Sequence, residues 1–95
     1  MDIISEKAMS FQEVVQAISG RKIVAGAKQL RKALISGTVG CVYLAQNADP
    51  AITEPILLLC QLHNVKVAWV RSMTDLGHAC GIEVGAAAAA TVISF

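Results

Sequence analysis

The chain has 95 residues, of which 55% are hydrophobic and 16% are charged, and its formal net charge is +1. A chain of this length is expected to form one domain, residues 1–95, because it can bury roughly 60–65% of its unfolded surface without a disulfide or a metal. So apolar a composition excludes intrinsic disorder, since burial offsets the conformational entropy lost on folding.

The apolar stretches do not predict a membrane span. Residues 33–48 are interrupted by serine, threonine and glycine, and residues 85–95 are too few, whereas crossing a bilayer takes roughly 18 to 20 apolar residues. The first residues, MDIISEK, carry an acid before a base and lack the apolar core of a secretion signal. We therefore expect a cytoplasmic protein with no membrane partner.

Three cysteines, Cys41, Cys60 and Cys80, stand inside apolar runs and form no C-x-x-C pair. This spacing indicates buried, reduced thiols and not a disulfide framework or a metal site. We expect neither a metal nor a cofactor.

The first third of the chain predicts a helix, a short strand and a second helix. Ser10 is placed to cap a helix whose apolar residues recur three and four apart up to Ile18. Residues 21–25 (RKIVA) form a short extended segment. The stretch GAKQLRKAL then predicts a helix from Gly26 that ends at Gly37. Its packing side and its free side differ in chemistry, with Leu30, Ala33 and Leu34 on one and Lys28, Gln29 and Lys32 on the other.

Two later runs, residues 41–45 (CVYLA) and 65–70 (VKVAWV), are continuously apolar and contain β-branched and aromatic residues. Such runs are typical of strands covered on both faces. Between them, Thr53 as cap, Glu54 in the first turn and Pro55 as an early proline predict a helix.

The last third predicts a short helix and a final strand. Ser72 and Asp75 form an S-x-x-D capping pattern for a helix that Gly81 closes. From Val84 onward, the small residues of GAAAAATVISF predict a strand that helices pack against closely. The alternation of helices and strands favours an α/β fold, arranged as a three-layer α/β/α sandwich.

Positive charge is concentrated in one segment. Five of the eight basic residues lie between residues 21 and 32, and no acidic residue occurs between Glu13 and Asp49. Such a segment suits a phosphate-rich ligand, because charges act over about 8 Å at physiological salt. The helix start at residues 26–27 adds unpaired backbone N–H groups, and glycine permits close approach. The charge pattern alone is equally compatible with a solvated helix face.

Patterns for catalysis are weak. Gly77, Gly81 and Gly85 recur every four residues but lack the G-K-[ST] element of a phosphate loop. His78 and Cys80 are two residues apart and have no third orienting group, so they do not predict a nucleophilic pair. We expect no enzymatic activity, no catalytic residue and no small-molecule substrate.

Three segments carry a resemblance to a known family: GAKQLRKAL at residues 26–34, NADP at residues 47–50, and LGHACGIEVGAAAAATV at residues 76–92. Together they resemble the kink-turn RNA-binding ribosomal proteins called L-seven-Ae and L-thirty-e, most closely their small bacterial members. The resemblance extends over residues 20–93. It implies an α/β/α sandwich with a mixed, roughly four-stranded sheet, in agreement with the periodicity.

The resemblance also implies an RNA site in two parts, the start of the basic helix and a later loop. The residues implied are Gly26, Ala27, Lys28, Gln29, Arg31, Lys32, Gly81, Ile82, Glu83 and Val84. In the family, the helix contacts the guanines of tandem G·A pairs and the flanking phosphates, and the loop covers an extruded nucleotide, here with Ile82 as an apolar lid. Lysine and glutamine suit guanine edges, since one donates to O6 and N7 and the other both donates and accepts.

One departure from the family bears on selectivity. Archaeal and eukaryotic members typically have Asn-Glu where this chain has Lys28 and Gln29, so the electrostatic contribution rises and guanine selectivity is left open. The function expected is a non-catalytic protein that binds kink-turn-like internal loops of structured RNA, on the ribosome or in a leader RNA. The alternative is a protein-interaction module of the same fold within a ribonucleoprotein or another assembly.

Overall fold

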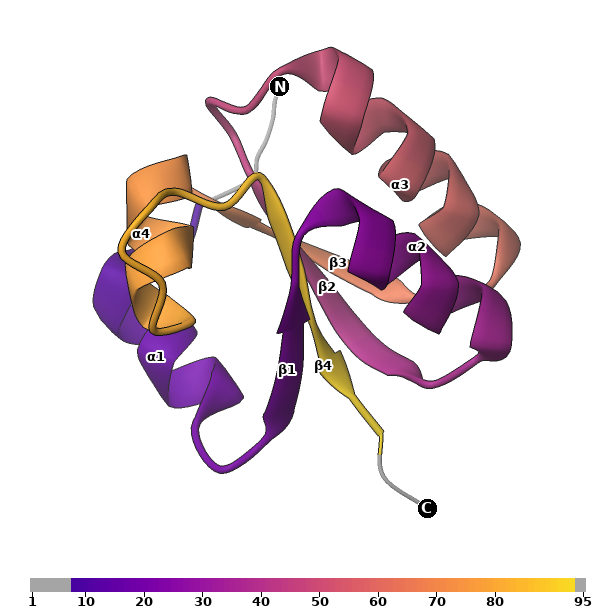
Figure 1. The fold of residues 1–95 in the computed structure, drawn as a ribbon, viewed down its shortest axis with the longest axis horizontal. Helices are drawn as coiled ribbons and strands as arrows, with labels where there is room; N and C mark the ends of the chain where they lie inside the picture. Colours follow the sequence, from indigo (N-terminus) through magenta and orange to yellow (C-terminus); the bar gives the residue numbers. More distant parts are fainter. Residues whose placement is uncertain (1–7, 94–95) are drawn as a thin grey trace, which may run out of the picture.

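The computed structural model describes residues 8–93, and they form three layers (Figure 1). The middle layer is a four-stranded sheet of β1 (Lys22–Ala25), β2 (Val39–Ala45), β3 (Lys66–Val70) and β4 (Ala88–Val92). One face is covered by α1 (Phe11–Ile18) and α4 (Met73–Ala79), and the other by α2 (Ala27–Ser36) and α3 (Pro50–Leu62). The predicted α/β/α sandwich is thereby confirmed.

The sheet is mixed, with the strand order β1-β4-β2-β3. Strand β4 is antiparallel to both neighbours, β1 and β2, whereas β2 and β3 are parallel. Because β1 and β4 run in opposite directions, the end of β1 and the start of β4 meet at one end of the sheet, where Ala25 pairs with Ala89. The start of α2 and the loop before β4 are therefore brought to the same place.

The alanine run forms the centre of the sheet. Ala88 and Ala90 face the core beneath α2 and α3, and Ala89 faces the core beneath α1 and α4, as the alternation of side chains along a strand requires. All three are almost completely buried. Their small side chains leave space on both faces, which Leu30 of α2 and Tyr43 of β2 help to fill.

Local capping signals define three helix ends as predicted. At α1 the Ser10 hydroxyl accepts from the Glu13 N–H and the Glu13 carboxylate accepts from the Ser10 N–H, at 3.3 and 2.8 Å, which is a complete capping box. At α4 the Ser72 hydroxyl accepts from the Asp75 N–H at 3.1 Å. Helix α2 ends at Gly37, whose φ of 75° is left-handed.

The predicted start of α3 at Thr53 is wrong, because the helix begins at Pro50. The Asp49 carboxylate caps it by accepting from the Ala51 N–H at 3.0 Å. Proline is favoured at the first helical position, where its missing N–H has no helical partner in any case. Thr53 is instead buried within the helix, and Pro55 is accommodated inside it.

The strands also differ from the prediction at their ends. The final strand begins at Ala88 and not at Val84, because the preceding loop bonds to α4: the Ala86 N–H donates to the carbonyl oxygen of Met73 at 3.0 Å. Strand β2 begins at Val39, two residues before the predicted start. Strand β3 lies at the sheet edge, so only its last residue, Val70, is fully covered.

The cysteines are free thiols, as predicted, but they are not equally covered. Cys60 is buried, whereas Cys41 and Cys80 are half-buried. Burial raises the pKa of all three thiols.

None of the described helices is long and apolar enough to cross a bilayer.

Candidate nucleic-acid interface

Helix α2 starts at an exposed glycine that is tied to the sheet. The Gly26 N–H donates to the carbonyl oxygen of Ala88 at 3.0 Å, and the Gly26 carbonyl accepts from the Leu30 N–H at 3.0 Å. Its φ of 101° lies where side chains are disfavoured. No side chain caps this helix start, so the N–H groups of residues 27–29 have no partner within the helix. The result is an outward-facing end of partial positive charge.

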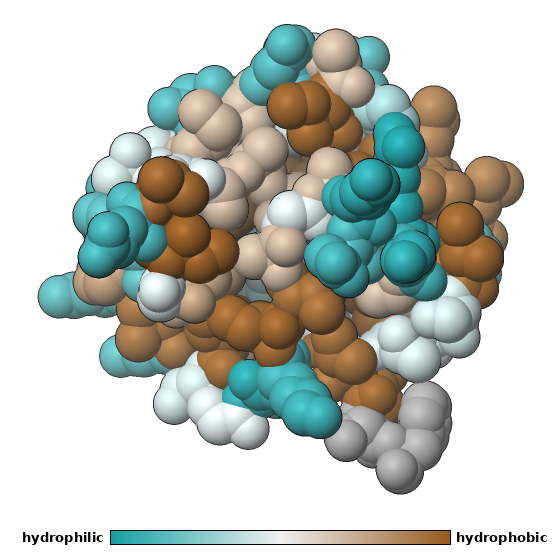
Figure 2. Space-filling model, in the orientation of Figure 1, coloured by the Kyte–Doolittle hydropathy of each residue, from teal (hydrophilic) through white to brown (hydrophobic). Residues whose placement is uncertain are grey.

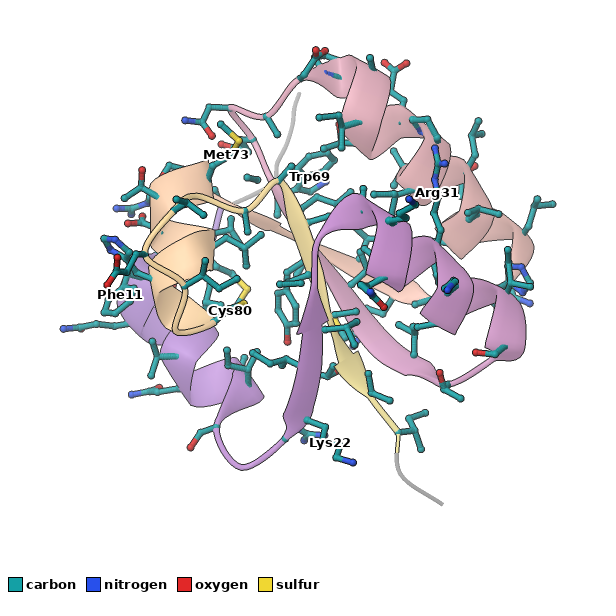
Figure 3. The ribbon with its side chains drawn as sticks, viewed as in Figure 1. Phe11, Lys22, Arg31, Trp69, Met73 and Cys80 are labelled. Carbon is teal, nitrogen blue, oxygen red and sulfur yellow. The ribbon has the colours of Figure 1, made fainter. Side chains whose placement is uncertain are left out.

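The two sides of α2 differ as the sequence predicts. Leu30 and Leu34 are completely buried against the sheet. Figure 2 shows hydrophilic side chains gathered over this helix. The four polar residues of its first turns are all exposed, namely Lys28, Gln29, Arg31 and Lys32. In Figure 3, Arg31 extends from α2 on the side of α3. The cations are not covered by any described part of the chain.

The loop that joins α4 to β4 is held rigidly against α4. The Ile82 N–H donates to the carbonyl oxygen of Gly77 at 2.9 Å. A Cβ added to Gly77 would overlap the carbonyl oxygen of Val84 and lie 3.0 Å from the Cα of Gly85. Only glycine allows α4 and the loop to approach so closely. Gly77, the first glycine of the LGHACG segment, therefore sets the position of the loop.

A groove of about 340 Å³ joins the helix start to this loop. Residues 25–27 form one wall, Ile82 and residues 84–87 form the other, and Ile52 of α3 contributes at the end. The lining is mainly apolar, and Val84 is 69% exposed at its rim. Figure 1 shows the loop and the start of α2 at the same end of the sheet.

Of the ten residues that the resemblance implied, four line the groove and six lie on the helix and loop that bound it. Gly26, Ala27, Ile82 and Val84 line the groove. The polar residues of α2 stand beside it on the helix, and Gly81 and Glu83 are exposed on the loop but do not line the groove.

Ile52 was not predicted from the sequence. It is 40% exposed in the first turn of α3 and lines the groove. The sequence feature that could have located it is the Asp49–Pro50 pair, because a helix that begins there places Ile52 at the same end of the sheet as Gly26.

Within residues 8–93, no group of three or more side chains is arranged to hold a metal ion.

The fold and the groove define a small α/β protein whose exposed cationic helix start adjoins an apolar loop. The sequence profile of the ribosomal protein L7Ae/L30e/S12e/Gadd45 family matches residues 9–94, and the chain belongs to this family.

Several proteins similar to this chain are named as RNA-binding proteins. An "RNA-binding protein" of Bacillus pumilus is 46% identical over 85 residues, which is 90% of this chain and 100% of that protein. The "RNA-binding protein YbxF" of Geobacillus stearothermophilus is 45% identical over 82 residues, 86% of this chain and 96% of the relative. Among solved structures, the "Giardia lamblia 15.5kD RNA binding protein" superposes with a TM-score of 0.75 at 28% identity, covering 85% of this chain and 68% of that one.

Proposed function

We propose that this protein is a non-catalytic, cytoplasmic RNA-binding protein, a single domain over residues 1–95, that recognises kink-turn-like internal loops of structured RNA. The observation that carries the proposal is the groove between the start of α2 and the loop before β4. The names of its relatives, which are RNA-binding proteins, support the class of ligand. The natural RNA belongs to the ribosome or to a structured leader.

The phosphate backbone is attracted by the start of α2. Unpaired N–H groups at a helix start form an anion site, and the helix dipole adds about half a positive charge there. Lys28 and Lys32 lie one turn apart on the same exposed face, so they reach the same groove of the RNA or adjacent phosphates. Arg31 adds a third exposed cation beside them.

Selectivity arises from the distortion of the RNA. A regular A-form helix hides its base edges in a deep, narrow groove, whereas internal loops expose them and splay bases out. Lys28 then donates to guanine O6 and N7, and Gln29 donates and accepts at once. A splayed nucleotide enters the groove and packs against Ile82, Val84 and Ile52, whose side chains are apolar and partly exposed.

The proposal is tested with three RNAs: a kink-turn, the same sequence with its G·A pairs disrupted, and a straight duplex. We expect tight binding of the first alone, with affinity that falls steeply as salt rises, because bound cations displace counterions from phosphates. Equal binding of all three would contradict selective recognition. Binding of none would favour the protein-interaction alternative.

A further inference from the structure

A second surface hollow lies at the opposite end of the sheet from the groove. Two depressions of about 500 and 430 Å³ open where β1, β2 and β3 begin and β4 ends. They share Arg21, Gly40, Thr91 and Ile93 in their linings. They therefore adjoin each other, and we call the two together the basal hollow.

The charge of the basal hollow has a single sign. Arg21, Lys22 and Lys66 line it and are all exposed, and none of the described residues that line it carries a carboxylate. In Figure 3, Lys22 lies at the end of β1 that is remote from α2. Three cations without an acidic partner in the lining favour an anionic ligand.

The floor of the basal hollow is formed by neutral polar side chains. Thr91, which is 5% exposed, accepts the Cys41 N–H at 3.1 Å through its hydroxyl oxygen. Within residues 8–93, the Thr91 hydroxyl donates no hydrogen bond of its own. Burial raises the pKa of Tyr43 to about 12 and also raises the pKa of the Cys41 thiol. Both side chains stay protonated at neutral pH, so they do not repel an anion.

We propose that the basal hollow is a second phosphate-binding site, which takes the backbone of an RNA stem that flanks the loop held at the groove. This inference rests on the proposed function. The hollow opens broadly at the surface, with Lys22 on β1 and Lys66 on β3 at its sides, and such a shape suits a chain of phosphates that passes over it.

The spacing of the two sites suits one RNA. Lys22 and Gly26 are separated by the length of β1, which is about 13 Å at the usual rise along a strand. In Figure 2, apolar side chains occupy the surface over β1, between the hydrophilic group over α2 and another at the foot of β1. Ile23 and Val24 of β1 are half-buried. The two cationic sites are thus separate, and only a stem long enough to cross the gap engages both.

The test compares two kink-turn RNAs that differ only in the length of one flanking stem. The comparison is made twice, once for each of the two stems that flank the loop. The short stem ends before the span between the sites, and the long stem exceeds it. We expect the wild-type protein to bind the long-stem RNA about tenfold more tightly at physiological salt. Its affinity for that RNA should also fall more steeply with salt, because each added phosphate contact adds about one to the salt slope.

Variants of the hollow separate this gain from general charge attraction. Arg21→Gln and Lys66→Gln should each remove about threefold of the gain for the long-stem RNA and leave the short-stem RNA unchanged. Each should also lower the salt slope for the long-stem RNA by about one. The matched control is Arg71→Gln, which removes an exposed cation just after the other end of β3 and should act equally on both RNAs.

Three outcomes overturn the inference. The first is equal binding of both RNAs by the wild type, and the second is an equal effect of Arg21→Gln and Lys66→Gln on both RNAs. In either case the proposed function still stands, because the short-stem RNA remains bound. The third is failure of the wild type to bind even the short-stem RNA, which removes the proposed function and this inference together.

A readout without variants uses Cys41, which lines the basal hollow and is half-buried. The alkylation of Cys41 is followed by mass spectrometry, with the two RNAs compared at the same fraction of bound protein. The long-stem RNA should slow this alkylation about tenfold more than the short-stem RNA, as expected if its tenfold tighter binding comes from occupancy of the hollow. Equal rates with the two RNAs would contradict occupancy of the hollow.

Discussion

The backbone N–H of Gly26 donates a hydrogen bond to the carbonyl oxygen of Ala88 at 3.0 Å. Gly26 is the N-cap residue of α2. Ala88 is the first residue of β4 and directly follows the loop that forms the other wall of the groove. The two parts of the candidate site are therefore joined by a backbone hydrogen bond at one end of the sheet.

Gly26→Ala tests this connection. A Cβ at Gly26 meets no atom within 4 Å, so its cost comes from the backbone φ of 101°, which is of order 1–3 kcal/mol for a side chain. We expect a loss of that size in the free energy of unfolding in urea, together with weaker kink-turn binding. The control is Gly37→Ala, which puts a side chain at a left-handed φ of 75° at the far end of α2 and should lower stability without changing RNA affinity. Unchanged stability of Gly26→Ala would contradict the prediction.

Gly77→Ala tests the contact that positions the loop. The added Cβ overlaps the carbonyl oxygen of Val84, and because this atom belongs to the backbone, one of the two segments must shift to relieve the overlap. Overpacking of this kind costs about 1–3 kcal/mol or more, so we expect a lower Tm and a loss of kink-turn binding. Gly81→Ala, in the same loop, has strain at φ 79° but no nearby atom, and should destabilise less. Equal Tm values for Gly77→Ala and the wild type would show that the loop moves freely.

Lys32→Ala and Gln29→Ala separate charge from base recognition. Both side chains are exposed, so the fold, followed by circular dichroism, should not change. Lys32→Ala should lower the salt slope of binding by about one, as the loss of one phosphate contact requires. Gln29→Ala should cost about 1–3 kcal/mol with the intact kink-turn and little with the G·A-disrupted RNA. Ile35→Ala, further along the same helix and 69% exposed, is the control without effect on RNA.

Ile52→Ala tests a residue that the sequence did not indicate. Its side chain lines the groove and is 40% exposed, so truncation should change stability by less than about 1 kcal/mol. Kink-turn affinity, measured by titration calorimetry, should fall severalfold because a splayed base loses apolar contact. Leu58→Ala, on the same helix and 61% exposed outside the groove, should have no such effect. The same affinity for both variants would exclude Ile52 from the site.

The pKa values of Tyr43 and Cys41 predict how stability depends on pH. Burial raises the pKa of Tyr43 from 10.0 to about 12 and raises that of Cys41 from 9.0. The native state therefore holds these protons more tightly than the unfolded chain, so its stability is complete below about pH 9 and falls as the pH rises toward about 12. Urea unfolding under reducing conditions should show this fall, and Tyr43→Phe should reduce it. A rise in stability over the same interval would contradict the assignment.

Much of the fold follows from local chemistry. Ser10, Ser72 and Gly37 each act at the helix end where the sequence placed them, because capping needs only neighbouring residues. The start of α3 is misplaced in the sequence prediction because two prolines compete as early helix residues, and the Asp49–Pro50 pair, not Thr53 and Pro55, forms the cap and the first residue.

The candidate site was predictable in its parts but not in its assembly. The cations and the start of α2 were evident from the sequence, whereas the late loop was indicated only by the family resemblance. Ile52 was missed because its place depends on where α3 begins. The basal hollow joins residues from four strands, and no local pattern reports that the strand order β1-β4-β2-β3 brings Arg21 and Lys66 to one surface.

If the proposed function is right, the start of α2 and the loop before β4 bind one bent RNA together. The most direct measurement is a titration of the isotope-labelled protein with a kink-turn RNA, following backbone amide resonances. We expect the amides of residues 26–32 and of residues 81–84 to shift together and to saturate at the same RNA concentration. Shifts confined to one of these segments, or centred on α1 with both segments unchanged, would contradict it.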